Sequence, residues 1–108
     1  MESLRDKRRR PTHPGEILKE DVLSDLGITQ TEFAKQLRVS RQTVSELLRE
    51  RRPLTPDMAI RLSRLVGGTP GGWLRMQQAV DLWEVEHGDT KKYASIKKIR
   101  TPKERKVG

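Results

Sequence analysis

The sequence contains no cysteine, so disulfide bonds and thiolate metal sites are excluded. Aromatic residues make up only 4% and hydrophobic residues 32% of the 108 residues, which is enough for one small core and too little for two. No apolar run reaches the length of a transmembrane helix, and the basic start of the chain is not followed by the apolar segment of a secretory signal. We therefore expect one small cytoplasmic domain.

Residue sets that carry catalysis are also missing. The sequence has no glycine-rich phosphate loop, no serine-histidine-acid set with a supporting spacing, and no paired carboxylates beyond ordinary surface acids. His13 and His87 lie far apart, and neither belongs to a metal-binding spacing, so we expect no metal and no cofactor. His13 is predicted to be a capping or surface residue. These observations argue against an enzyme.

Positive charge is plentiful, and most of the excess lies in two tails. The formal net charge is +8. Residues 1–10 carry five basic and two acidic residues, and residues 88–108 carry eight basic and two acidic residues. Residues 11–87 therefore carry ten basic and eleven acidic residues. We predict a basic N-terminal arm over 1–11, a folded domain over 12–87 and a basic tail over 88–108. Each tail is either a solvated segment or an arm that contacts phosphates.

The central stretch, residues 29–52, predicts two short helices joined by a three-residue turn. Thr29 and Glu32 have the spacing of a capping box, which starts the first helix. Ser40 is a good N-cap for the second helix. Apolar residues at helical spacing then form the inner faces, and small Ala34 allows a close helix contact. These inner-face residues are Phe33, Leu37, Val44, Leu47 and Leu48.

The outer face of the second predicted helix has the side chains of a DNA-reading surface. Arginine can bind guanine through two hydrogen bonds, glutamine can bind adenine in the same way, and threonine can contact thymine. The spacing is typical of a helix-turn-helix, whose second helix enters the major groove. The alternative is an ordinary soluble first turn on an exposed helix. The candidate residues are Arg41, Gln42, Thr43, Ser45 and Arg49.

Three further helices are predicted, which makes the fold all-α. The first opens at Thr12–Glu16 and ends at Gly27, a natural left-handed C′ residue. Another starts at Thr55-Pro56, and the last runs from Thr69-Pro70 to about Glu86 or His87. Gly71 and Gly72 weaken the first turn of the last helix.

Apolar residues recur along the last helix in a heptad-like stripe. This stripe comprises Trp73, Met76, Val80 and Trp83. Such a stripe usually packs in the hydrophobic core of its own domain. Two tryptophans on an outermost helix, however, also predict that part of the stripe forms a homodimer contact. In the tail, Tyr93, Ile96 and Ile99 are spaced by three, which is compatible with a weak amphipathic helix, a strand that pairs with a partner, or a solvated segment.

The segments HPGEIL, TQTEFAKQLRVSRQTVSELLRERRPLT and DMAIRLSRLVGGTPGGWLRMQQAVDLW occur in this order over residues 13–83. This pattern resembles the HigA/VapI group of Xre-type helix-turn-helix proteins. The resemblance implies a five-helix, lambda-repressor-like domain that dimerises on a palindromic operator in double-stranded DNA and represses its own operon. It also implies the antitoxin of a type II pair, whose toxin is a HigB-like mRNA endonuclease. Gln30 would brace a phosphate, and Ser40, Arg41, Gln42, Thr43 and Ser45 would belong to the recognition helix.

The sequence departs from this family at three places. Arg38 stands where such turns usually have glycine, a position that often needs positive φ, so we expect a turn that is either slightly strained or shaped differently. Gly71-Gly72 replaces larger residues before the tryptophan, and the lysine-rich tail matches no family motif. Two other functions are compatible with the residues alone: a stand-alone transcriptional regulator without a toxin, and a protein-interaction module whose tails bind partners.

Overall fold

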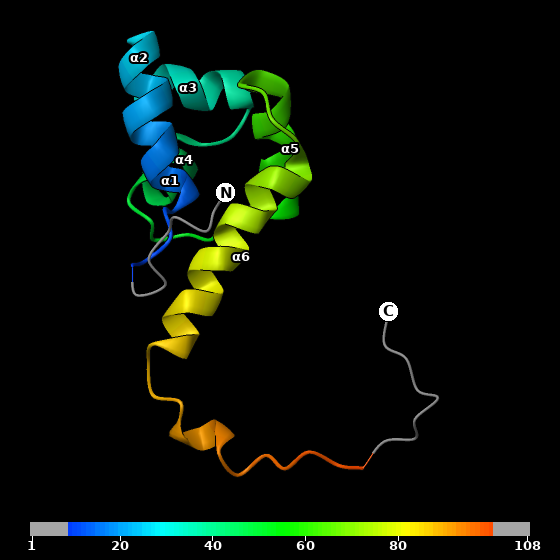
Figure 1. Cartoon of the computed structure of the whole chain (residues 1–108). Helices are drawn as coiled ribbons and strands as arrows, with labels where there is room; N and C mark the ends of the chain where they lie inside the picture. Colours follow the sequence, from blue (N-terminus) through cyan, green and yellow to red (C-terminus); the bar gives the residue numbers. More distant parts are fainter. Residues whose placement is uncertain (1–8, 101–108) are drawn as a thin grey trace.

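The computed structural model describes residues 9–100, and within this range the chain is helical with no strand (Figure 1). The first helix is continuous through three segments: α1 (Pro14–Ile17), the π-helical η2 (Leu18–Leu23) and α2 (Ser24–Leu26). It is followed by α3 (Gln30–Leu37), α4 (Arg41–Leu48), α5 (Pro56–Leu65) and α6 (Pro70–Glu86), and a short 3₁₀ turn, η3, spans Lys91–Tyr93. The predicted all-α, five-helix architecture is confirmed.

The N-caps lie where the sequence predicts them. The hydroxyls of Thr29, Ser40, Thr55 and Thr69 each accept a hydrogen bond from the backbone N–H three residues later, at 3.0–3.2 Å. Each bond satisfies one donor that the first helical turn leaves unpaired. The second half of the predicted capping box is different, because the Glu32 carboxylate accepts from Gln36 Nε2 at 3.0 Å.

The π-helical segment of the first helix is not predicted by the sequence. Its hydrogen bonds join residues five apart, so residues at that spacing approach the same side. Leu18 and Leu23, at the two ends of η2, are both buried. The wider turn therefore places both leucines in the core. Gly27 then ends the helix with φ 67°, as predicted.

One hydrophobic core lies between the helices. Its largest fully buried side chains include Phe33 of α3, Leu47 of α4 and Leu62 of α5. The helices α1 and α4 approach each other so closely that a Cβ added at Gly15 would lie 2.1 Å from the Leu47 carbonyl oxygen. This contact fixes α4 against the first helix.

The two ends of the described chain behave differently. Arg10 and Pro11, which the sequence analysis assigns to the basic arm, lie against the domain: Pro11 is buried and Arg10 bonds to Glu50 and Glu84. Residues 88–100 are exposed throughout and lead away from the end of α6 (Figure 1). In the described part of the chain, none of the helices combines the length and the apolar character that a membrane span requires.

Candidate nucleic-acid interface

The turn between α3 and α4 is held in a left-handed conformation at Arg38. Arg38 has φ 64° and ψ 43°, so of the two alternatives the turn keeps the left-handed conformation with a non-glycine residue in it. The backbone N–H of Arg38 donates to Lys35 O at 3.2 Å, and that of Val39 donates to Ala34 O at 3.0 Å. These bonds satisfy carbonyls at the end of α3.

A second element clamps this turn from outside. Arg61 of α5 donates from Nη1 to the carbonyl oxygens of Leu37, at 2.8 Å, and Arg38, at 3.2 Å. The Arg61 guanidinium is itself held by Asp57 Oδ2, 2.8 Å from Nε. Arg61 is not among the residues predicted from the sequence, where its i,i+4 spacing from Asp57 indicates the ion pair but not the bonds to the turn.

The recognition helix α4 has one buried side and one exposed side. Val44, Leu47 and Leu48 are buried in the core. Arg41 and Gln42, in the first turn, are exposed. The structure therefore presents the guanidinium and the amide on the side away from the core, as the sequence predicts.

Two other candidate residues of α4 are bonded to each other. Ser40 Oγ accepts from the Thr43 N–H at 3.0 Å and lies 2.9 Å from Thr43 Oγ1. Thr43 and Ser45 are half-buried. Ser40 and Thr43 thus hold the shape of the first turn, whatever else they contact.

Gln42 already has an acceptor on its own helix. Its Nε2 donates to Glu46 Oε2 at 3.1 Å. The other oxygen of Glu46 accepts from Arg52 Nε and Nη2, at 3.1 and 2.8 Å. The hydrogen bonds from Arg52 and then Gln42 hold the pKa of Glu46 below its ordinary value. Glu46 is not among the sequence candidates, although its i,i+4 spacing from Gln42 indicates the contact.

The remaining two candidates, Gln30 and Arg49, lie at the start of α3 and at the end of α4. Gln30 is the first residue of α3 and is half-buried. Arg49 is the exposed C-cap of α4, eight residues beyond Arg41 and therefore about 12 Å along the helix axis. The structure brings residues 40–45 together and leaves Arg49 at the far end of α4.

A polar cluster joins the N-terminal segment to α4 and α6. Arg10 bonds Glu84 Oε2 through Nε at 2.8 Å and Glu50 Oε1 through Nη1 at 2.9 Å. His13, only 3% exposed, caps α1: its Nδ1 accepts from the Gly15 N–H at 2.9 Å. The capping role predicted for His13 is confirmed and the surface alternative is wrong. Burial lowers the pKa of His13.

A buried amide connects the loop after α4 to α6. Gln77 Oε1 accepts from the Leu54 N–H at 2.8 Å, and Gln77 Nε2 donates to Asp81 Oδ1 at 2.9 Å. Within residues 9–100, no buried side-chain nitrogen or oxygen lacks a partner. In the same range, no group of three acidic or histidine side chains forms a candidate metal site.

The burial of α6 narrows the dimer prediction. Trp73 is 8% and Val80 1% exposed, and Trp73 Nε1 donates to Gly67 O at 2.9 Å. These two residues pack within the chain's own domain, which leaves Met76 and Trp83 as the more accessible members of the stripe; the dimer contact stays a prediction. Met76 and Trp83 are half-buried, and Trp83 stacks on His87 with ring centroids 4.1 Å apart.

The comparisons with known proteins agree with this geometry. The family model described as helix-turn-helix matches residues 18–74. The chain is 43% identical over 84 residues to an HTH-type transcriptional regulator, YbaQ, of Escherichia coli K12, covering 78% of this chain and 74% of YbaQ. It is 42% identical over 84 residues to antitoxin HigA-1 of Vibrio cholerae, covering 78% and 79%.

A solved structure extends the likeness to a protein on DNA. This is the Pseudomonas aeruginosa antitoxin HigA with the higBA promoter. The chain is 35% identical to it, with a TM-score of 0.75, and the match covers 82% of this chain and 97% of the other.

Proposed function

The chain belongs to the helix-turn-helix family that includes the HigA-type antitoxins, and from this membership we propose that it is a sequence-specific autorepressor and the antitoxin of a type II toxin–antitoxin pair. The observation that carries the DNA-binding part is α4, with Arg41 and Gln42 exposed above a buried inner face. The P. aeruginosa relative is described with its promoter, which supports the same partner here.

In the proposed complex, the first turn of α4 enters the major groove. Arg41 reads a guanine and Gln42 an adenine, while Ser40, Thr43 and Ser45 hold or extend this contact. Gln30, at the start of α3, and Arg49, at the end of α4, contact phosphates and set the register of the protein on the duplex. The basic residues Lys35, Arg38, Arg51 and Arg52 are exposed on the same motif and add phosphate attraction.

The proposed operator is palindromic and is bound by a homodimer. Two copies of α4 then enter successive major grooves, about 34 Å apart. We assign the dimer contact to α6, with half-buried Met76 and Trp83 beside the exposed Leu82 and Val85. Trp73 and Val80 support this helix from inside the domain.

The proposed toxin is a HigB-like mRNA endonuclease, and the antitoxin itself carries no catalytic site. The family is one of DNA-binding regulators and antitoxins, not an enzyme family. We place the protein in the cytoplasm, where its operator lies. A stand-alone regulator is the second candidate, because the relative YbaQ is named as an HTH-type transcriptional regulator. Co-purification with the product of an adjacent gene separates the two.

The test of DNA binding is a titration of the chain's own upstream DNA. Wild-type affinity falls steeply with salt, because phosphate contacts release counterions. Arg41→Ala weakens binding to the operator by about 10- to 100-fold, which corresponds to about 1–3 kcal/mol for one bidentate base contact. The control is Arg64→Ala, which removes an exposed arginine from α5. Equal footprints and affinities for the Arg41 variant and the wild type would refute the assignment of α4.

A further inference from the structure

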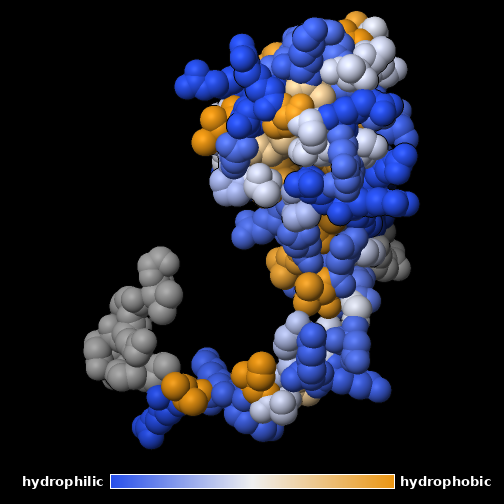
Figure 2. Space-filling view, turned by 180° about the vertical axis from the view of Figure 1, so that it is seen from behind, coloured by the Kyte–Doolittle hydropathy of each residue, from blue (hydrophilic) through white to orange (hydrophobic). Residues whose placement is uncertain are grey.

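Exposed apolar side chains concentrate at one end of the molecule. Seven large hydrophobic residues are exposed within residues 9–100, and five of them lie on the last two turns of α6 or beyond it. These five are Leu82, Val85, Tyr93, Ile96 and Ile99. Figure 2 shows the same concentration as orange patches on the lower part of α6 and on the extended segment.

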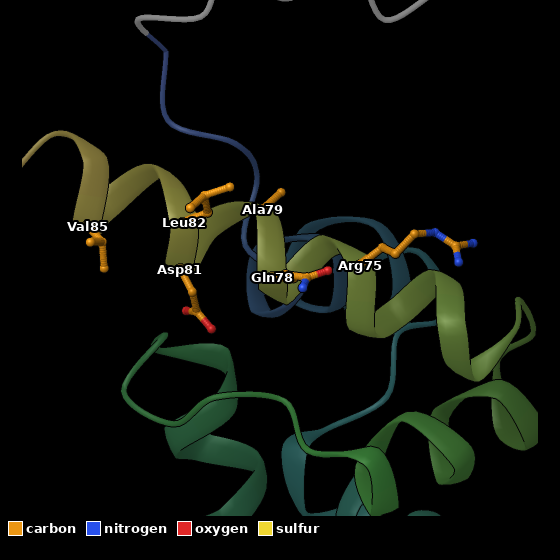
Figure 3. Close-up of a pocket in the computed structure, with 6 residues that line it drawn as sticks. All are labelled: Arg75, Gln78, Ala79, Asp81, Leu82 and Val85. Carbon is orange, nitrogen blue, oxygen red and sulfur yellow. The ribbon is translucent and has the colours of Figure 1, made fainter. Parts of the chain in front are cut away.

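The α6 groove is the hollow along the outer side of this helix, with a volume of about 530 Å³. It is lined by Arg75, Gln78, Ala79, Asp81, Leu82 and Val85, shown in Figure 3. Its apolar members, Ala79, Leu82 and Val85, are spaced by three residues. Leu82 is 56% and Val85 50% exposed, so nothing in the chain's own described part covers them.

The segment 93–99 has a matching apolar pattern. Tyr93, Ile96 and Ile99 are also spaced by three, and Ile96 and Ile99 are 72% and 75% exposed. Residues 96–100 are not helical, so the segment would lie in the groove in an extended course, with its apolar side chains against the apolar members of the groove. Such packing would remove from water the five side chains that the monomer leaves exposed.

Hydrogen-bonded turns direct this segment away from its own α6. Asp89 Oδ1 accepts from the Lys91 N–H at 3.0 Å, and Thr90 O accepts from the Tyr93 N–H at 3.0 Å. Tyr93 O then accepts from the Ile96 N–H at 3.1 Å. With these turns formed, the segment leads away from the end of its own α6 (Figure 1), which favours the groove of another chain as its docking site.

The charges of the two surfaces are opposite. The segment and its flanks carry Lys91, Lys92, Lys97, Lys98 and Arg100. The last turns of α6 carry Asp81, Glu84 and Glu86. Glu84 already pairs with Arg10 of the same chain, and Arg75 lines the other end of the groove, so Asp81 and Glu86 are the acidic groups left for the segment. Opposite charges at the rim favour this pairing over pairing of two like segments or two like grooves.

We propose that segment 93–99 of each copy docks in the α6 groove of a second copy, so that two exchanged tails clasp the dimer. The exchange is reciprocal and closed, as two-fold symmetry requires. This inference rests on the proposed function in one respect, because it takes the operator-binding form to be a homodimer.

The first test is Ile96→Asp in the full-length chain. Ile96 is 72% exposed and lies outside the core, so the variant keeps the wild-type helix content, which shows that it still folds. Its monomer–dimer dissociation constant, measured by sedimentation equilibrium, rises at least about 100-fold, because each dimer loses two buried isoleucines and gains two charges at the apolar stripe. Ser95→Asp makes the same charge change one residue away from the stripe and leaves the dissociation constant within about threefold of the wild type. An unchanged constant for Ile96→Asp would overturn the clasp.

The second test uses the absence of native cysteine. Leu82→Cys and Ile96→Cys are introduced into two differently tagged chains, which are mixed and oxidised. A disulfide between the two tags is the expected product. A chain that carries both cysteines tests the alternative, in which the segment occupies the groove of its own α6. A monomeric, internally crosslinked product would mean that the tail folds onto its own α6, and the proposal would be overturned.

Failure of the clasp and failure of the proposed function give different results. A wild-type protein that is monomeric even on operator DNA would refute the homodimer and the clasp together. If the wild type is a dimer and Ile96→Asp leaves the dimer dissociation constant unchanged, only the clasp is refuted. If that variant loses DNA affinity while its dimerisation constant is unchanged, the tail is a DNA-contacting arm and the clasp is again refuted.

Discussion

The helix-turn-helix, residues 29–52, and the C-terminal region, residues 74–100, both present side chains to solvent, but of opposite kinds. On α4, the exposed first turn is polar and its apolar residues are buried. On the end of α6 and beyond, leucine, valine and isoleucine side chains are more than half or about half exposed. The first surface suits a charged, hydrated partner such as DNA, whereas the second suits a protein. The proposed DNA contact and the proposed dimer contact therefore lie at two ends of one small domain.

The largest effect is expected where the first helix supports α4. Gly15→Ala places a Cβ 2.1 Å from Leu47 O, so the two helices must separate. We expect a loss of about 3 kcal/mol in the free energy of unfolding, measured by urea titration, together with loss of operator binding. Gly71→Ala is the matched change on α6, where the Cβ meets only the mobile Arg75 side chain at 3.3 Å. It should stabilise by up to about 1 kcal/mol. Similar results for the two variants would contradict the tight α1–α4 contact.

A smaller effect is expected at the clamp on the turn. Arg61→Ala removes the donors to Leu37 O and Arg38 O, at a cost of about 1–2 kcal/mol of stability. Because the clamp fixes the angle between α3 and α4, operator affinity should fall further than stability alone explains. Thermal unfolding and DNA titration measure the two quantities. Asp57→Ala removes only the exposed partner of Arg61 and should cost less. If both variants bind DNA as the wild type does, the clamp has no role in recognition.

Arg38→Gly tests the left-handed turn with a change in the stabilising direction. A non-glycine residue in this conformation costs roughly 1 kcal/mol, which glycine avoids, although glycine loses more freedom on folding. We expect a net gain of a few tenths to about 1 kcal/mol in the free energy of unfolding by chemical denaturation. Arg38→Ala, which keeps the strain without the charge, provides the comparison. Stability equal to that of the glycine variant would mean that the turn is not strained.

The smallest expected effect is the pH dependence of stability that comes from His13, which lies where the N-terminal segment meets α4 and α6. His13 must be neutral at Nδ1 to accept from Gly15, and burial lowers its pKa below the ordinary 6.5. The unfolded chain therefore takes up the proton first as the pH falls. The contribution of His13 is fully present above about pH 6.5 and is lost as the pH falls towards the folded-state pKa. Arg10, Glu50, Asp81 and Glu84 are the charged groups whose electrostatic effects reach this ring, and Glu50 opposes the shift most.

His13→Asn is the control for that pH dependence. Asparagine caps helices without titrating, so the variant's stability should change less between pH 7 and 5 than that of the wild type. Melting temperatures across this range measure the difference. Parallel pH profiles for the two proteins would show that His13 is not the group responsible.

The elements that the sequence predicts correctly are those set by local chemistry. The four hydroxyl caps, the helix end at Gly27 and the buried faces of α3 and α4 each depend on residues within one or two turns. The fold follows from them because caps and apolar spacing leave few ways to arrange five short helices.

The contacts that the sequence does not predict join distant segments. Arg10 with Glu84, Gln77 with Leu54 and Arg61 with Leu37 are separated by 74, 23 and 24 residues, and no local pattern marks them. The stripe on α6 shows the same limit, because spacing alone does not say which of its sides meets the domain. Only the packed structure shows that Trp73 and Val80 point inward while Leu82 and Val85 remain outside.

The hydrogen bond from Gln42 to Glu46 would make the proposed base reading by Gln42 an exchange of one acceptor for another. When the amide moves onto a base, Glu46 Oε2 takes water in its place, because this hydrogen bond is exposed, while Arg52 keeps its two bonds to Oε1. Adenine offers the amide both an acceptor and a donor and so replaces the contact with Glu46 more fully than a base that offers an acceptor alone. Before any duplex arrives, the proposed reader is thus already held in place by a residue of its own helix.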